Sequence, residues 1–166
     1  MNGGKRLFIM RHAKSAWPDF EMPDFDRPLL PKGIADTKKI GQANTNDLSL
    51  LKIIMSSSAV RTMQTATILC DVLGLPLQQV VANNNLYLPL VTSILKVVKE
   101  LPNNIGNAMI ISHNPGLTDF VNEYLPKPLA NMPTATLVCL HFNVERWASI
   151  RPDNLVDSWV DFPANH

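Results

Sequence analysis

The chain has 166 residues, of which 46% are hydrophobic and 17% are charged, and its formal net charge is +1. This length and composition predict one globular domain over residues 1–166 and exclude a disordered chain. Because the chain has no dense tract of Lys and Arg, we expect neither nucleic acid nor an anionic membrane as its main partner.

The first predicted element is a strand over residues 7–10, where four apolar residues follow Lys5 and Arg6. Such an uninterrupted run is typical of a strand buried on both faces, as in a parallel sheet. The run ends in Arg11 and His12, and ligands of open α/β sheets bind beyond the carboxyl ends of the strands. Arg11 and His12 are therefore candidate ligand-binding residues, although surface residues at a strand end would show the same pattern.

Residues 16–31 contain four prolines, with Trp17, Phe20 and Phe25 between them. Prolines at this density exclude a helix or a central strand. The aromatic residues favour an ordered loop packed on the domain over a disordered insertion. Two elements are predicted to follow this loop: a helix with a weak apolar face over residues 33–46 and a buried strand over residues 50–55.

A well-marked helix comes next, because apolar residues recur every three to four positions over residues 59–73. Ser58 is the expected N-cap, and Gly74 followed by Pro76 is typical of a helix end. Arg61 lies in the first turn, where the helix dipole favours anions rather than cations. This position favours a bound anion beside Arg61, although an ordinary surface arginine would need none.

Three further elements are predicted over the next part of the chain: a short strand over 78–82, a helix over 89–101 and an apolar strand over 107–112. The last of these strands leads into His113, Asn114 and Pro115. Asn114 suits an N-cap and Pro115 suits the first position of a helix. His113 would then lie at a helix N-terminus, which favours anion binding, although a structural histidine would fit there as well.

Apolar residues between 117 and 125 form the inner face of the helix that Pro115 would begin, and the C-terminal region predicts a hairpin of two strands, over residues 134–142 and 147–150. The alternation of strands and helices along the chain indicates an α/β sandwich with a mostly parallel central sheet.

Cys70 and Cys139 both fall in apolar stretches and are too few for a disulfide scaffold, so we expect buried free thiols. No apolar run is long enough to span a bilayer, and the run before Arg11 is too short for a signal peptide. We therefore expect a soluble, cytoplasmic protein.

The residues singled out above follow three predicted strands, whose carboxyl ends share one edge of a parallel sheet. Arg11, Arg61, His12 and His113 can therefore meet there. Guanidinium forks match phosphate oxygens, which makes a dianionic phosphoryl group the expected ligand. A neutral imidazole is a competent nucleophile toward phosphorus near pH 7. Because the cations would neutralise the phosphoryl charge, and because no hard-cation cage is evident, we expect no metal and no cofactor.

Three segments resemble the histidine phosphatase (phosphoglycerate-mutase-like) superfamily: residues 11–15 (Arg-His-Ala-Lys-Ser), residues 56–66 and residues 112–116 (Ser-His-Asn-Pro-Gly). Within it, three more segments are similar to the short SixA-type phosphohistidine phosphatases: residues 26–29 (Asp-Arg-Pro-Leu), 86–87 and 132–135. The match runs from about Arg6 to Trp147. The resemblance implies a three-layer α/β/α sandwich.

The resemblance also implies a role for each matching residue. His12 would be the nucleophile that is transiently phosphorylated. Arg11, Arg61 and His113 would complete the phosphate pocket, and the backbone N–H of Asn114 would be a further donor.

Two features depart from the superfamily pattern. Ala13 and Lys14 replace the Gly-Glu pair of many members, and the extra charge of Lys14 suits an acidic or protein substrate. Residues 83–85 are asparagines, where many members have a Glu or Asp that acts as the general acid. Asp26 is the best alternative acid, although a structural ion pair with Arg27 would also explain it. Three weaker candidates are Asp19, Asp24 and Asp119.

The missing acid bears on the substrate, because general-acid help is worth roughly 10²–10⁴-fold for a poor leaving group. The leaving nitrogen of phosphohistidine can already be protonated near neutral pH. The sequence therefore predicts a metal-independent phosphatase that acts through phospho-His12, with phosphohistidine on a protein domain as the preferred substrate. A phosphomonoesterase for a small phosphorylated metabolite and a non-catalytic phospho-binding module are the alternatives. The second is disfavoured because all four pocket residues are present, and a mutase is the least expected.

Overall fold

The computed structural model describes residues 4–17 and 21–166. Its six strands form one sheet in the order β3–β2–β4–β1–β5–β6. The strands are β1 (Gly4–Arg11), β2 (Ile53–Ser56), β3 (Val80–Ala82), β4 (Asn107–Ser112), β5 (Leu137–Asn143) and β6 (Leu155–Asp161). The four strands β1 to β4 run parallel, whereas β5 and β6 pair antiparallel at one side of the sheet.

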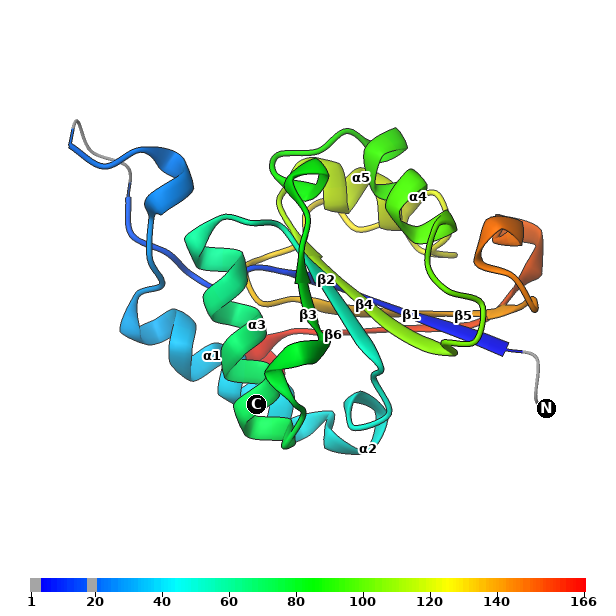
Figure 1. Ribbon diagram of the computed structural model, residues 1–166, viewed down its shortest axis with the longest axis horizontal. Helices are drawn as coiled ribbons and strands as arrows, with labels where there is room; N and C mark the ends of the chain where they lie inside the picture. Colours follow the sequence, from blue (N-terminus) through cyan, green and yellow to red (C-terminus); the bar gives the residue numbers. More distant parts are fainter. Residues whose placement is uncertain (1–3, 18–20) are drawn as a thin grey trace.

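Helices cover both faces of this sheet (Figure 1). They are α1 (Pro31–Ala43), α2 (Thr45–Leu48), α3 (Val60–Leu73), α4 (Val91–Lys99) and α5 (Gly116–Asn122). The helices α1 and α3 pack together on one face, and α4 and α5 pack together on the other. The predicted three-layer α/β/α sandwich with a mostly parallel sheet is confirmed.

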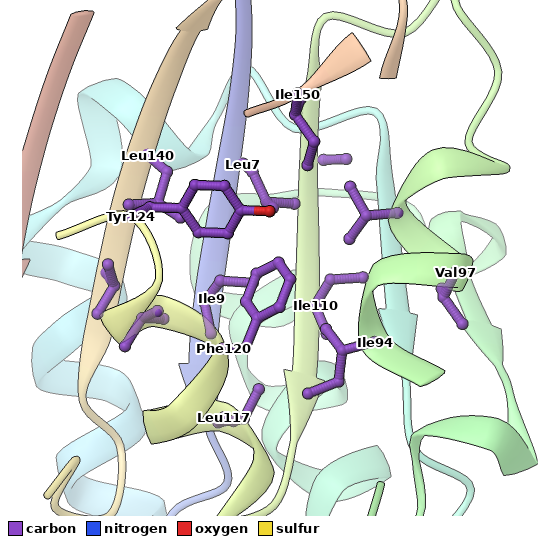
Figure 2. Close-up of a cluster of buried hydrophobic side chains, with 14 of the residues drawn as sticks. Leu7, Ile9, Ile94, Val97, Ile110, Leu117, Phe120, Tyr124, Leu140 and Ile150 are labelled. Atoms are coloured by element: carbon purple, nitrogen blue, oxygen red, sulfur yellow. The ribbon is translucent and has the colours of Figure 1, made fainter. Parts of the chain in front are cut away.

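The uninterrupted apolar run of β1 follows from its central place between two helical layers. Leu7 and Ile9 point toward α4 and α5, and Figure 2 shows them among the side chains of that cluster. Phe8 and Met10 point toward α1 and α3. All four side chains are fully buried, and each such burial stabilises the fold by roughly 1.5–3 kcal/mol. β1 therefore holds Arg11 and His12 on a rigid support.

The prediction of a hairpin strand over residues 147–150 is wrong. This segment forms a 3-10 turn, Trp147–Ser149, and β6 pairs with β5 in its place. Trp147 is fully buried, its indole N–H donates to the carbonyl of Ile105, and its backbone N–H donates to the side chain of Asn103. These bonds tie the turn to the segment before β4 and keep it out of the sheet.

Two local predictions near helix ends also need correction. The helix expected over residues 33–46 is divided into α1 and α2 at Asn44. Ser58 is not an N-cap, because α3 is preceded by Ala59, whose backbone N–H donates to the Ser57 hydroxyl.

Cys70 and Cys139 are free and buried, as expected. Among the helices of the described ranges, none has both the length and the apolar character that crossing a membrane requires.

Candidate active site

The side chains predicted to converge lie at the carboxyl edge of three neighbouring strands. Arg11 ends β1, and His12 follows it. Arg61 lies in the first turn of α3, which follows β2, and His113 follows β4 directly. Since β2, β4 and β1 are adjacent and parallel, these ends lie side by side. The ring centroids of His12 and His113 are 5.3 Å apart.

The Arg61 guanidinium joins the two imidazoles. Its Nε donates a hydrogen bond of 3.3 Å to Nε2 of His12, and its Nη2 lies 3.1 Å from Nδ1 of His113. The residue is only 2% exposed, although it carries a charge. One edge of the guanidinium, formed by Nε and Nη2, therefore faces the space between the two rings.

The protonation state of His12 follows from its neighbours. Nδ1 lies 2.8 Å from the carbonyl oxygen of Ala13, which can only accept, so Nδ1 carries the proton. Nε2 then has a free electron pair, which accepts the bond from Arg61. Burial lowers the pKa of His12 to about 3, aided by the charge of Arg61 and opposed by the bond to Ala13. His12 is thus neutral near pH 7, with Nε2 available as a nucleophile.

His113 is held as the opposite tautomer. Its Nδ1 accepts from Arg61, so the proton is on Nε2, which donates to the Ser57 hydroxyl at 2.8 Å. Burial, followed by the charge of Arg61, lowers the pKa of His113 to about 3. An anion placed between the rings would raise the pKa of His113 and favour a second proton, on Nδ1.

Arg11 brings a second guanidinium to the same edge. Its Nη1 donates to the Met132 carbonyl at 2.9 Å, but its Nε is buried and has no hydrogen-bond partner among the described residues. Burial and the nearby charge of Arg61 lower the pKa of Arg11. An unpaired buried N–H costs about 1–3 kcal/mol, and a bound anion would remove that cost.

Asn114 and Lys14 lie beside these four residues. The side-chain oxygen Oδ1 of Asn114 accepts from the backbone N–H of Thr118. The predictions of Asn114 as the N-cap and Pro115 as the first helical residue need correction, because Pro115 is the N-cap and α5 begins at Gly116. The Asn114 amide also donates to the Met132 carbonyl, to which Arg11 is bonded. Lys14 is exposed and lines a cavity of ≈ 350 Å³ together with Arg11 and His12.

The carboxylate that the structure brings to the site is Asp24, not Asp26. Asp24 lies in a 3-10 turn, Asp24–Asp26, and its Oδ2 accepts from Nη2 of Arg61 at 3.1 Å and from the Tyr87 hydroxyl at 2.5 Å. Its Oδ1 accepts from Nη1 of Arg27 at 2.8 Å, so Asp24 makes the ion pair that was expected for Asp26. Asp26 is exposed.

Asp24 is ionised in this setting. Desolvation raises its pKa, but the hydrogen bonds from Tyr87, Arg27 and Arg61 outweigh that effect and hold the pKa well below its usual range. Of the other weak candidates, Asp119 is exposed and Asp19 lies outside the described residues.

Sequence reasoning did not assign Tyr87, Arg27 or Ser57 to the site. Tyr87 lies edge-on to His113, with ring centroids 5.3 Å apart. Arg27 donates to the carbonyl of Ala16 as well as to Asp24, and so links two parts of the loop in which these residues lie. The sequence signal that could have indicated Tyr87, Arg27 and Ser57 is that each lies in or beside a segment that resembles the superfamily. Within residues 4–17 and 21–166, no group of three or more His, Cys, Asp or Glu side chains could hold a metal ion.

Comparison with known proteins relates part of the chain to a known family. The model of the histidine phosphatase superfamily (branch 1) matches residues 7–82. An uncharacterised chloroplastic protein of Arabidopsis thaliana is 43% identical over 61 residues, which are 37% of this chain and 28% of that protein. An uncharacterised protein of Mycobacterium tuberculosis is 28% identical over 106 residues, which are 64% of this chain and 63% of that protein. The chain thus spans less than two thirds of the length of either relative.

Solved structures extend the similarity to nearly the whole fold. The proposed phosphohistidine phosphatase SixA of Nakamurella multipartitia superposes with a TM-score of 0.80 at 24% identity, covering 97% of both chains. The protein histidine phosphatase SixA, complexed with tungstate, gives a TM-score of 0.78 at 22% identity, covering 96% of this chain and 98% of that one. These matches show a shared fold, and the predicted phosphoglycerate-mutase-like fold class is confirmed.

Proposed function

We propose that the chain is a member of the histidine phosphatase superfamily, whose model matches residues 7–82, and that it is a phosphatase that works through a phosphohistidine intermediate on His12. We further propose that its preferred substrate is phosphohistidine carried by a protein. No metal is required in this mechanism, because guanidinium groups supply the charge that stabilises the transferring phosphoryl group.

The observation that carries this proposal is the position of the Arg61 fork between Nε2 of His12 and Nδ1 of His113. A guanidinium fork binds two oxygens of a phosphoryl group at once. A phosphoryl group held by this edge would have its phosphorus beside the free electron pair of His12. The unpaired Nε of Arg11 supplies a further donor for the same anion.

The reaction proceeds in two displacements. In the first, Nε2 of His12 attacks phosphorus, and the leaving group departs with the electrons of its bond to phosphorus. The proton stays on Nδ1, which donates to the Ala13 carbonyl, and this hydrogen bond stabilises the phosphorylated ring. In the second, water attacks the same phosphorus, the P–Nε2 bond breaks, and dihydrogen phosphate leaves with both water protons. His12 returns as the neutral ring.

The protonation states of the side chains around the site support a substrate whose phosphorus is bonded to nitrogen. Residues 83–85 are asparagines and provide no acid, and Asp24 is ionised. An alkoxide leaving group would miss general-acid help worth roughly 10²–10⁴-fold, whereas a protonated imidazole leaves without it. SixA structures of the same fold carry the names phosphohistidine phosphatase and protein histidine phosphatase. The exposed Lys14 and Trp17 at the cavity rim suit contact with a protein partner.

The covalent intermediate is tested by trapping. The protein is mixed with a ³²P-labelled phosphohistidine protein and quenched in alkali, and we expect label that is stable in base and labile in acid. His12→Ala should remove this label and reduce turnover by more than a thousandfold. His141→Ala is the control, because β5 pairs His141 with Arg6, at the opposite end of β1 from Arg11. Label that persists in His12→Ala would overturn the intermediate.

The substrate class is tested by comparing kcat/KM for P–N, aryl and alkyl phosphates. We expect the phosphohistidine protein to exceed glycerol phosphate and sugar phosphates by at least a hundredfold. A clear preference for an alkyl ester would reject phosphohistidine as the substrate and favour a metabolite phosphomonoesterase. Phosphate-ester binding without any turnover would reduce the protein to a binding module.

A further inference from the structure

The Arg61 guanidinium uses two different edges. Nε and Nη2 face the imidazoles of His12 and His113, whereas Nη1 and Nη2 face Asp24, through its backbone oxygen at 2.8 Å and its Oδ2 at 3.1 Å. A phosphoryl group that takes the first edge does not need to displace Asp24 from the second. The carboxylate therefore stays beside the phosphoryl site while a substrate is bound.

Among the described residues, Asp24 also has an acceptor position that no donor fills. An ionised carboxylate can accept about four hydrogen bonds, and from the residues that the structure describes Asp24 accepts three, from Arg27, Arg61 and Tyr87. Its side chain is 37% exposed, while that of Arg61 is 3% exposed. A group that enters from solvent can therefore reach Asp24 while the phosphoryl group lies deeper, against Arg61.

We infer that Asp24 is a specificity-determining residue, which accepts a hydrogen bond from the distal ring N–H of a substrate phosphohistidine and so selects P–N over P–O bonds. This inference rests on the proposed function. The ionised Asp24 has no proton to give to an ester leaving group, but it can accept a hydrogen bond from the N–H of a phosphorylated imidazolium.

The chemistry of the transfer step explains why an acceptor beside the substrate ring favours cleavage of a P–N bond. A phosphoryl group leaves imidazole readily only when the distal nitrogen of that ring is protonated, so that the ring departs neutral. The P–N bond breaks, its electron pair returns to the substrate nitrogen, the distal N–H stays in place, and a new bond forms from phosphorus to Nε2 of His12. The carboxylate stabilises the cationic ring before transfer, as the Ala13 carbonyl stabilises His12 after it. Two imidazoles thus exchange one phosphoryl group, each held by an acceptor oxygen.

The charged and titratable groups that face Asp24 leave it suited to this role. Arg27 and Arg61 keep it ionised, Tyr87 donates to it, and the ring of His113 lies beyond Tyr87. An ester oxygen offers no N–H to this carboxylate.

The test compares Asp24→Asn with Asp26→Asn, a matched change at an exposed carboxylate of the same turn. The probes are phosphoimidazole, p-nitrophenyl phosphate and glycerol phosphate. We expect Asp24→Asn to lower kcat/KM for phosphoimidazole at least tenfold. At saturating phosphoimidazole we expect kcat to fall more at pH 8 than at pH 6, where the bound probe is protonated in both proteins. Turnover of p-nitrophenyl phosphate should fall by a clearly smaller factor, since this ester has no ring N–H for Asp24 to accept, and circular dichroism with thermal unfolding shows whether the variant is folded. Asp26→Asn should match wild type on every probe.

Each other outcome has a distinct meaning. An equal loss on phosphoimidazole and p-nitrophenyl phosphate would overturn the inference, since Asp24 would then only position Arg61. The largest loss on glycerol phosphate would overturn it in favour of a general acid, and a gain on all probes would make Asp24 a competitor of the phosphate. If wild type does not turn over phosphoimidazole or phosphohistidine at all, the proposed function fails, and this inference with it.

A measurement on wild type alone avoids any folding defect of the variant. The burst rate of His12 phosphorylation at saturating phosphoimidazole is followed against pH. We expect its basic limb to lie about one pH unit above the protonation midpoint of free phosphoimidazole, because the carboxylate stabilises the protonated probe. Coincidence of the two midpoints would overturn the inference.

Discussion

Arg61 contacts both imidazoles and Asp24, and it is buried with its charge. We expect Arg61→Ala to lower kcat/KM more than a hundredfold, on the order of 3 kcal/mol, through lost stabilisation of the transferring phosphoryl group. Steady-state kinetics on p-nitrophenyl phosphate measures this. Arg151→Ala, at an exposed position outside the site, serves as the control. A loss below tenfold would mean that Arg61 does not touch the phosphoryl group.

The two buried imidazoles should also make stability depend on pH. Folding lowers the pKa of His12 and of His113 from 6.5 to about 3. Below pH 6.5 the unfolded chain therefore binds protons that the folded chain does not. The free energy of unfolding should fall by roughly 2 kcal/mol for each histidine between pH 7 and pH 5.

Urea unfolding of wild type and His113→Asn at pH 5, 6 and 7 measures this dependence. The variant should lose stability with falling pH about half as steeply as wild type, because one of the two histidines is gone. The same slope of unfolding free energy against pH in both proteins would mean that His113 does not contribute to the pH dependence.

At the scale of elements, α1 supports the site through close contact with the chain just after His12. A Cβ on Gly33 would overlap the carbonyl oxygen of Lys14, which accepts from the backbone N–H of Leu30. Ser15 and Leu29 form an antiparallel bridge next to this bond. The first turn of α1 thus fixes Lys14, and with it the neighbouring Ala13 carbonyl that orients His12.

Gly33→Ala should therefore reduce both stability and activity. We expect a loss of about 1–3 kcal/mol in the free energy of unfolding, as for other overpacked positions, and a fall in kcat from a displaced His12. Chemical denaturation and steady-state kinetics measure the two effects. The control is Gly106→Ala, where a Cβ would lie 3.8 Å from its nearest neighbour. Unchanged kcat in Gly33→Ala would mean that the contact between α1 and Lys14 does not determine the orientation of His12.

At the scale of the whole molecule, phosphate binding should stabilise the fold, because the site is assembled from three strands and two helices that meet only in the native state. Inorganic phosphate at about a hundred times its Kd should add about 2.7 kcal/mol to the free energy of unfolding. Thermal unfolding with phosphate, against sodium chloride of equal ionic strength, measures this. The increase should vanish in Arg61→Ala, and an increase that survives there would place the anion elsewhere.

The amino-acid sequence by itself determined the order and type of most elements, and it predicted the four residues that the structure brings together at the candidate site. Apolar runs, helical periodicity and Gly or Pro stops are local signals that act over a few residues. The convergence of Arg11, His12, Arg61 and His113 followed from one rule of parallel sheets, that the carboxyl ends of the strands share an edge.

Only the tertiary structure decided which carboxylate belongs to the site and which strand closes the sheet. Asp24 and Asp26 lie in the same turn, and the choice between them depends on Tyr87 and Arg61, which are distant in sequence. Likewise, β6 replaced the strand expected at residues 147–150 because Trp147 is bonded to residues 103 and 105. These outcomes depend on packing and hydrogen bonds between segments far apart in the chain, and such contacts leave no local pattern in the sequence.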